Sequence, residues 1–447
     1  MNKKNEIDML HGSLVDKILT VALPLAAISI LQQLFNAADV AVVGRFASDN
    51  ALAAVGANTP IINMFITFFT GLATGGNVAI SIMIGRGERE KVNRGIQSIY
   101  TLSLICVVIL LAAGELLAAP ILHWVNTPEN VLDKAVLYLR IYLFAMVFAV
   151  IYNFMAAILR SKGDTKRPLY CLIASGIINV ILNLIFVIGF HMDVAGVAIA
   201  TLIANIVNAG AVIIILMHES GEFQLDISRL TIDPEVIRFA LRIGLPAGLQ
   251  GFLFSASNII IQSGINSFGA DCIAGNTAAM NFEFMVFFIV NAFGQTATTF
   301  TSQNYGAGEY DRCKKVYRYC MILETAIAGV VSLIFYFGAD FWLGFFTTSP
   351  AVIEYAMVRM TLVVLLEFTT GFNDTAACSL RGLGISLQPT IISIMGTCVL
   401  RIIWVATIFR WYHNIYILMA VYPISWVLLS VPMMTTYFVM RKRLFAD

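Results

Sequence analysis

Residues 159–168 read LRSKGDTKRP, and residues 380–389 read LRGLGISLQP. Both stretches carry the pattern Leu-Arg-x-x-Gly followed by a proline, and they occupy similar places in the two halves of the chain. A pattern that recurs in this way is typical of a chain built from structurally equivalent parts. The two stretches therefore predict a fold made of two related halves.

Four further landmarks recur in the same order and at nearly the same spacing. They are Gly85-Arg86-Gly87-Glu88 with Gly306-Ala307-Gly308-Glu309, Leu23-Pro24 with Leu245-Pro246, Phe46 and Asp49 with Phe268 and Asp271, and Asn58-Thr59 with Asn276-Thr277. Such agreement in order and spacing is hard to attribute to chance. We expect an N-lobe at 1–218, a cytoplasmic connector at 219–235 and a C-lobe at 236–447.

The composition indicates a polytopic membrane protein. Of the 447 residues, 59% are hydrophobic and 12% are charged, with a mean hydropathy of +0.83. Soluble globular proteins carry about 25% charged residues. A net charge of +1 argues against a nucleic-acid partner, which favours a basic patch. The seven cysteines have neither metal-like nor disulfide-framework spacing.

Apolar runs predict twelve transmembrane helices, because about 20 residues cross the hydrocarbon core. The expected spans are 17–44, 52–84, 95–122, 134–159, 168–190, 195–218, 236–266, 273–303, 316–345, 352–380, 389–410 and 414–440. Six spans per half is an even number, so the two halves enter the membrane from the same side and are related by an axis along the membrane normal. We expect an all-α fold with two pseudo-symmetric six-helix bundles around a central cleft.

Basic residues predict the orientation. With both termini cytoplasmic, 22 of the 28 Lys and Arg residues lie on the inner side. The other six are Arg45, Lys134, Arg140, Arg359, Arg401 and Arg410. This asymmetry follows the positive-inside rule.

Together, the repeated turns and Asp39 followed by Gly44-Arg45 resemble the multidrug and toxic compound extrusion (MATE) family, in its bacterial DinF-like branch. The resemblance covers essentially the whole chain. It implies twelve helices in two lobes and export of organic cations or other amphipathic compounds, driven by inward flow of Na⁺ or H⁺. It also leads us to expect a monomer in the bacterial inner (cytoplasmic) membrane.

Asp39 lies in an apolar stretch, LQQLFNAADVAVVGRF, at residues 31–46. A carboxylate at membrane depth costs at least about 2.5 kcal/mol, so it needs a partner, an ion or a water-filled cavity. Helix packing can explain membrane-embedded amides but does not require a charge. We therefore predict that Asp39 binds an ion or a proton.

Three oxygen-bearing side chains are predicted to join it. Asn179 and Asn183 are spaced i,i+4 and share one helix face. Amide, hydroxyl and carboxylate oxygens suit a hard cation. In the MATE resemblance, Asp39, Asn179, Asn183 and Thr201 correspond to an N-lobe cation site, with Asn183 replacing a second acid. The single carboxylate leaves both Na⁺ and H⁺ open as the coupling ion.

Other polar residues are candidates for substrate contact or for a second proton site. Gln33 and Asn36 precede Asp39, and Glu283 lies in the run MNFEFMVFF. Asp374 falls opposite Asn153 when the halves are aligned on their Leu-Arg-x-x-Gly turns, so equivalent points of both lobes carry a polar group. A hydrogen bond to a neighbouring helix is the alternative interpretation of each.

The favoured function is a Na⁺- or H⁺-coupled multidrug efflux antiporter that works by alternating access. The chain has no G-x-x-x-x-G-K-[ST] pattern, so we expect no ATP-driven step and no cofactor beyond the coupling ion. A flippase for lipids or lipid-linked saccharides is one alternative, but it requires a more cationic cleft than these spans provide. An intramembrane enzyme is another, although no acid–base pair or metal cluster is recognisable. The expected partners are small molecules and membrane lipid.

Overall fold

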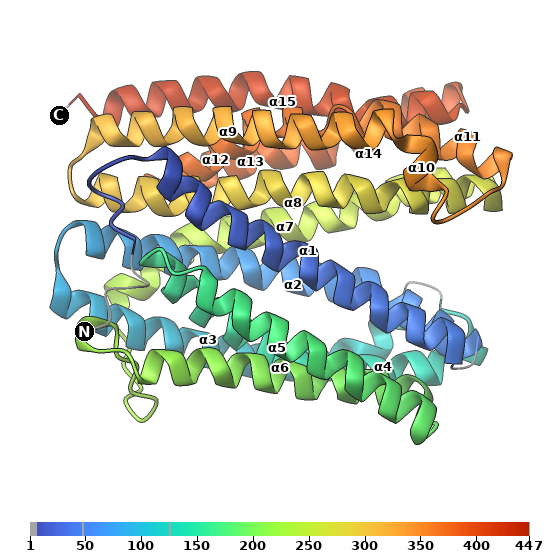
Figure 1. Cartoon of the computed structure of the whole chain (residues 1–447), viewed down its shortest axis with the longest axis horizontal. Coiled ribbons are helices and arrows are strands. Elements are labelled where there is room, and N and C mark those ends of the chain that lie inside the picture. Colours follow the sequence, from blue (N-terminus) through green and yellow to red (C-terminus); the bar gives the residue numbers. More distant parts are fainter. Residues whose placement is uncertain (1–6, 47–48, 125–126, 447) are drawn as a thin grey trace. The chain divides into compact units, whose positions relative to one another are not determined.

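The computed structural model describes residues 7–46, 49–124 and 127–446, and Figure 1 shows its helices. The first half contains α1 (Val15–Phe46), α2 (Asp49–Gly85), α3 (Arg89–Trp124), α4 (Glu129–Ser161), α5 (Lys166–Leu184), the π-helix η2 (Ile185–Gly189) and α6 (Asp193–Met217). A 3₁₀ turn, η3 (Gly221–Phe223), lies in the connector. The described residues contain no β-strand.

The second half begins with three long helices and continues through shorter, interrupted ones. These elements are α7 (Pro234–Asn266), α8 (Ala270–Gly306), α9 (Tyr310–Phe337), α10 (Ala339–Leu343), α11 (Pro350–Arg359), η4 (Met360–Val364), η5 (Glu367–Thr370), α12 (Gly371–Gly382), α13 (Leu387–Ser393), η6 (Ile394–Val399), α14 (Leu400–Trp404), η7 (Val405–Phe409) and α15 (Ile415–Leu444). The elements η4, η6 and η7 are π-helical, whereas η5 is 3₁₀. Irregular turns of this kind are frequent at functional sites.

Within the described ranges, eleven helical segments are long and apolar enough to cross a membrane. The remaining predicted span, 352–380, corresponds to the segment from α11 to α12, which leaves regular α-helical geometry at residues 360–370. The all-α fold class is confirmed. The predicted span at 316–345 was too long at its end, because α9 stops at Phe337 before Gly338 and α10 is a separate short helix.

The chain divides into two compact units. Unit 1 is Ala27–Gly248 with the residues before Met9, and unit 2 is Met9–Ala26 with Leu249–Asp447. Two helices are therefore shared, since α1 begins in unit 2 and α7 begins in unit 1. Each change of unit follows closely after a proline inside the helix, Pro24 in α1 and Pro246 in α7. Proline removes one helical hydrogen bond at such a point.

Close glycine contacts shape unit 1. Helix α4 packs against α2, α3 and α6, and α5 lies beside α6 (Figure 1). On α2, Gly71 and Gly75 meet the backbone of α7 so closely that a Cβ on Gly75 would lie 2.0 Å from the Ala240 carbonyl oxygen. Small residues allow membrane helices to approach in this way.

In unit 2, α8 packs against α9, α11 and α12, and α15 packs against α12. The segment before α1 is anchored to this unit. The carbonyl oxygen of Met9 accepts hydrogen bonds from Arg312 Nη2 at 3.0 Å and from Asn304 Nδ2 at 3.2 Å. Arg312 Nη1 also donates to the Gly12 carbonyl at 3.1 Å, and Met9 itself is fully buried.

The repeated turns have the same backbone geometry in both halves. Four glycines of the repeated motifs have left-handed backbone angles, with φ of 70° at Gly87, 77° at Gly308, 87° at Gly163 and 85° at Gly384. The residue after each glycine donates its N–H five positions back along the chain, as in Glu88 to Met83 and Glu309 to Asn304. This arrangement closes a helix C-terminus and requires a residue that tolerates positive φ. The repeated glycines therefore act as helix C-caps in both halves.

Candidate functional site in unit 1

Asp39 lies on the part of α1 that belongs to unit 1, and the residue that follows it faces outward. The Asp39 residue is 8% exposed, whereas Val40 is 44% exposed. Asn183 Nδ2 donates a hydrogen bond to Asp39 Oδ1, and Thr201 Oγ1 lies 3.3 Å from Asp39 Oδ2. The carboxylate therefore points inward from α1 to α5 and α6.

Asn179 completes this cluster. Its Oδ1 accepts from Asn183 Nδ2 at 3.3 Å, and its Nδ2 lies 3.4 Å from Thr201 Oγ1. The two asparagines face the same way because they are one helical turn apart on α5. The structure thus brings together all four residues that were predicted to form an ion or proton site.

The charge of Asp39 has no cationic partner among the described residues. The carboxylate contacts the Asn183 amide and the Thr201 hydroxyl, and neither group carries a charge. An isolated buried carboxylate is costly, so it favours a bound cation or a proton. No three His, Cys, Asp or Glu side chains gather into a cluster within the described ranges, so the donor set does not resemble a transition-metal centre.

One buried oxygen at this site lacks a partner. Asn183 is fully buried, and its Oδ1 accepts no hydrogen bond from the part of the chain that the structure describes. Rotation of its amide would turn Oδ1 toward the carboxylate in place of Nδ2. The cluster would then offer carboxylate, amide and hydroxyl oxygens, which are the ligands that a hard cation prefers.

The other N-lobe candidates do not join this cluster. Gln33 is half-buried and Asn36 is exposed, and neither makes a hydrogen bond to another described residue. Asn153 Nδ2 donates at 2.9 Å to the Ala149 carbonyl of its own helix, α4. This bond lies within α4, so it is not the hydrogen bond to a neighbouring helix that was the alternative interpretation of Asn153.

Unit 2 places Glu283 in an ion pair. Its carboxylate accepts from Arg359 Nε, while Arg359 Nη1 donates to Asn276 Oδ1, and all three residues are buried. Asp374 is half-buried, and its contact is with a different residue: Cys378 Sγ lies 3.8 Å from Asp374 Oδ2. The structure does not link Glu283 and Asp374 into one site.

Two arginines of unit 2 were missed as functional candidates. Arg359 and Arg401 are among the six basic residues expected on the outer side, and both side chains are buried inside span segments. Arg401 is 1% exposed, donates to Asn258 Oδ1 at 3.0 Å and lies over the Tyr422 ring at 4.4 Å. Their positions within apolar runs were the available signal, because intramembrane charges are rarely incidental.

The sequence model of the MatE family matches the chain twice, over residues 24–185 and 246–407. The chain belongs to the MatE family. The two matches begin at Pro24 and Pro246, which form one of the repeated pairs of landmarks. As a MatE protein it is a membrane transporter and not an enzyme.

Relatives and solved structures agree with this membership. The chain is 29% identical to the probable multidrug resistance protein YoeA of Bacillus subtilis, over 83% of this chain and 82% of that protein. It is 26% identical to the probable multidrug resistance protein NorM of Thermotoga maritima, over 86% of this chain and 84% of that protein. A solved MATE-family multidrug resistance transporter superposes with a TM-score of 0.91 and 21% identity over 98% of both chains. This MatE chain therefore has the fold of those transporters.

Proposed function

We propose that this MatE protein is a multidrug efflux antiporter that exports organic cations or other amphipathic compounds in exchange for inward Na⁺ or H⁺. The names of the relatives in Bacillus subtilis and Thermotoga maritima support efflux of several compounds. The coupling step rests on one observation, the buried Asp39 carboxylate held by uncharged donors from α5 and α6.

The geometry supports a binding-dependent change at Asn183. In the present arrangement its amide N–H groups face Asp39 Oδ1 and Asn179 Oδ1. A cation beside the carboxylate, or a proton on it, would be repelled by those N–H groups and attracted by the Asn183 Oδ1. Either ligand would therefore favour rotation of the amide, and the site would adopt two arrangements according to its occupancy.

Alternating access requires that the coupling ion bind the two states with different affinities. The Asn183 rotation supplies a local source of such a difference. When the halves are aligned on Pro24 and Pro246, the position opposite Asp39 is the buried Ile261. We therefore place the coupling site in unit 1 alone.

The substrate-facing acid is best assigned to Asp374. Arg359 already neutralises Glu283, so Glu283 has little net charge to offer a cationic compound. Asp374 is half-buried, and the thiol of Cys378 lies beside its carboxylate. Arg359 and Arg401 are occupied by protein partners, which gives no support to the flippase alternative and its cationic cleft.

We further propose that the protein acts as a monomer in the bacterial cytoplasmic membrane with both termini inside. The distribution of Lys and Arg supports this orientation, because 22 of 28 then lie on the inner side.

Transport in proteoliposomes tests the proposal. Purified protein is reconstituted with a fluorescent cation such as ethidium inside, and a Na⁺ gradient or a pH gradient is imposed separately. We expect efflux against the concentration gradient under at least one of them, and none after the gradient is collapsed with an ionophore. Efflux at the same rate with and without either gradient would overturn the coupling proposal. If no cationic dye is transported, the proposal that the substrates are organic cations is wrong.

A further inference from the structure

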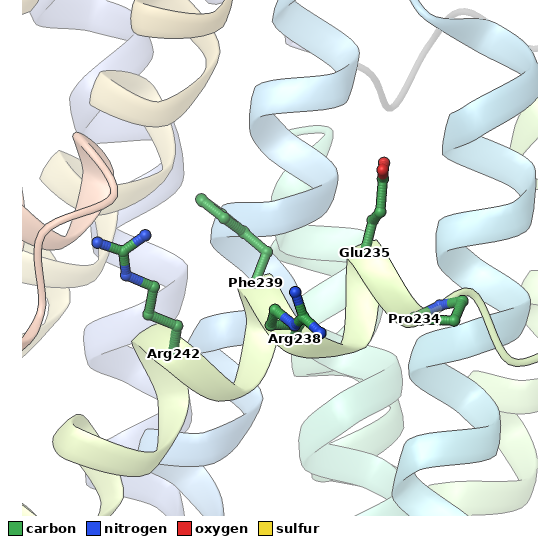
Figure 2. A pocket seen from close by; sticks show the side chains of 5 residues that line it. All are labelled: Pro234, Glu235, Arg238, Phe239 and Arg242. Carbon is green, nitrogen blue, oxygen red and sulfur yellow. The ribbon is translucent and has the colours of Figure 1, made fainter.

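The beginning of α7 carries two arginines beside a small cavity, within unit 1. The cavity measures about 280 Å³ and is lined by Pro234, Glu235, Arg238, Phe239 and Arg242 (Figure 2). Arg238 and Arg242 leave α7 one turn apart, and both are exposed. Neither forms an ion pair or a side-chain hydrogen bond with another described residue, so their charges are available to an external anion.

The opposite side of α7 is held against unit 1. The residues at four-residue spacing on that side, Ala240, Gly244 and Gly248, meet α2 at backbone distance. At about 100° per residue, Arg238 and Arg242 lie well round the helix from this contact. The arginine face is therefore turned away from α2 by packing and cannot rotate inward without breaking the glycine contacts.

The start of the helix is also fixed. Asp233 Oδ1 accepts from the Glu235 N–H at 3.0 Å, and the Asp233 N–H donates to Ser98 Oγ of α3 at 3.0 Å. Asp233 is thus engaged as a helix cap. Glu235 is the one acid among the cavity-lining residues, and its carboxylate extends away from the helix (Figure 2).

The depth of these arginines matches the membrane surface. Helix α7 has 33 residues and spans about 50 Å at about 1.5 Å per residue, whereas the hydrocarbon core is about 30 Å thick. At that rise, Arg238 and Arg242 lie about 6 and about 12 Å from the helix start, in the part expected at the headgroup level. The next residue on the same face, Leu245, is exposed and apolar. The face changes from cationic to apolar in the order in which a phospholipid presents its phosphate and its acyl chains.

We propose that Arg238 and Arg242 bind the phosphate of an anionic phospholipid in the cytoplasmic leaflet, with its acyl chains along Leu245. The cytoplasmic assignment rests on the orientation proposed above, whereas lipid binding itself does not require that the protein export drugs. Arginine suits this role because its planar guanidinium contacts two phosphate oxygens at once. Pro234 and Phe239 supply the apolar part of the cavity lining.

Native mass spectrometry of the delipidated full-length protein tests this site. Tetraoleoyl cardiolipin is titrated against phosphatidylethanolamine of the same chains, and bound lipid is counted for wild type and for Arg238→Ala, Arg242→Ala and the double variant. We expect wild type to prefer cardiolipin and each single substitution to weaken its binding about fivefold. The matched control, Lys442→Ala with Arg443→Ala, removes two basic residues from the end of α15, outside this cavity, and should leave the binding unchanged.

Three outcomes would overturn the proposal. They are no preference for cardiolipin in wild type, an equal loss in the Lys442 and Arg443 control, or undiminished binding in the double alanine variant. If that variant fails to fold, the pair Arg238→Lys and Arg242→Lys replaces it and should bind more weakly than wild type but above background. Inorganic phosphate is added as a competitor, and full displacement at millimolar concentration would show a free-phosphate site and contradict the lipid assignment.

Discussion

Replacement of Asp39 by asparagine should abolish ion-coupled efflux without unfolding the protein. The substitution keeps the size and shape of the side chain, and Asn183 can still donate to the remaining oxygen. In the variant the Thr201 hydroxyl hydrogen can turn from position 39 to the Val197 carbonyl, 3.0 Å away, and the Thr201 lone pairs can accept from the new amide. Every hydrogen bond around the position therefore has a replacement.

The energetic balance favours the folded variant. A charged aspartate at membrane depth costs at least about 2.5 kcal/mol, and the neutral amide removes that cost. We expect the thermal stability of Asp39→Asn in ion-free buffer to equal or exceed that of wild type. A coupling ion at about 100 times its dissociation constant stabilises the wild-type protein by about 2.7 kcal/mol, and the variant should lose this increment.

Two measurements on the same preparations check this prediction. Unfolding temperature is followed with and without Na⁺, and ethidium efflux is followed in proteoliposomes under imposed Na⁺ or pH gradients. Glu115→Gln serves as the control, because it removes a partly exposed carboxylate that lies 3.4 Å from Arg140, away from the site. Gradient-dependent efflux by Asp39→Asn at the wild-type rate would refute the assignment of Asp39 as the coupling residue.

Three further substitutions probe the packing and the charges around the site. Gly75→Ala should destabilise unit 1 by several kcal/mol, because its Cβ would meet the α7 backbone. Gly56→Ala is the control, since its Cβ would have open space, and it should be neutral or slightly stabilising. Thermal unfolding measures the stability of both variants. Arg359→Met leaves Glu283 without its cation and should cost about 3–5 kcal/mol, while adding Glu283→Gln should recover much of that loss in the same assay. Glu219→Gln should lower stability by about 1–3 kcal/mol at neutral pH. Burial acts to raise the pKa of Glu219, but its basic partners outweigh burial and hold that pKa below the ordinary 4.5. The loss of stability in the variant relative to wild type should therefore persist above pH 4.5 and shrink as the pH falls below it.

Sequence reasoning reached the twelve spans and the internal repeat because both depend on local signals. Apolar runs report burial in lipid directly, and Gly163 and Gly384 mark positions where positive φ is obligatory. Asp39 was also recognisable by itself, since an acid in an apolar run is rare. Its partners on α5 and α6 came from the family resemblance, and the structure brings those side chains together.

The charged network of unit 2 was beyond that reasoning. Glu283 and Arg359 are 76 positions apart in the chain, and only the packing of α8 against α11 brings them together. The break between α11 and α12 was equally hidden, because the residues around Glu367 remain apolar enough to read as one continuous span. Pairing and helix irregularity are properties of tertiary contacts, which periodicity along one segment does not report.

The anchoring of Met9 in unit 2 has a consequence for biogenesis. Met9 is translated long before Asn304 and Arg312, whose side chains donate hydrogen bonds to its carbonyl oxygen. At about 5–20 residues per second, roughly 15–60 s of translation separate the two ends of this contact. During that time the start of α1 must wait in the membrane or at the insertion machinery without its final neighbours. Completion of unit 2 is therefore a late event, and a nascent chain that stops before α8 lacks both donors and should leave the segment around Met9 open to proteolysis.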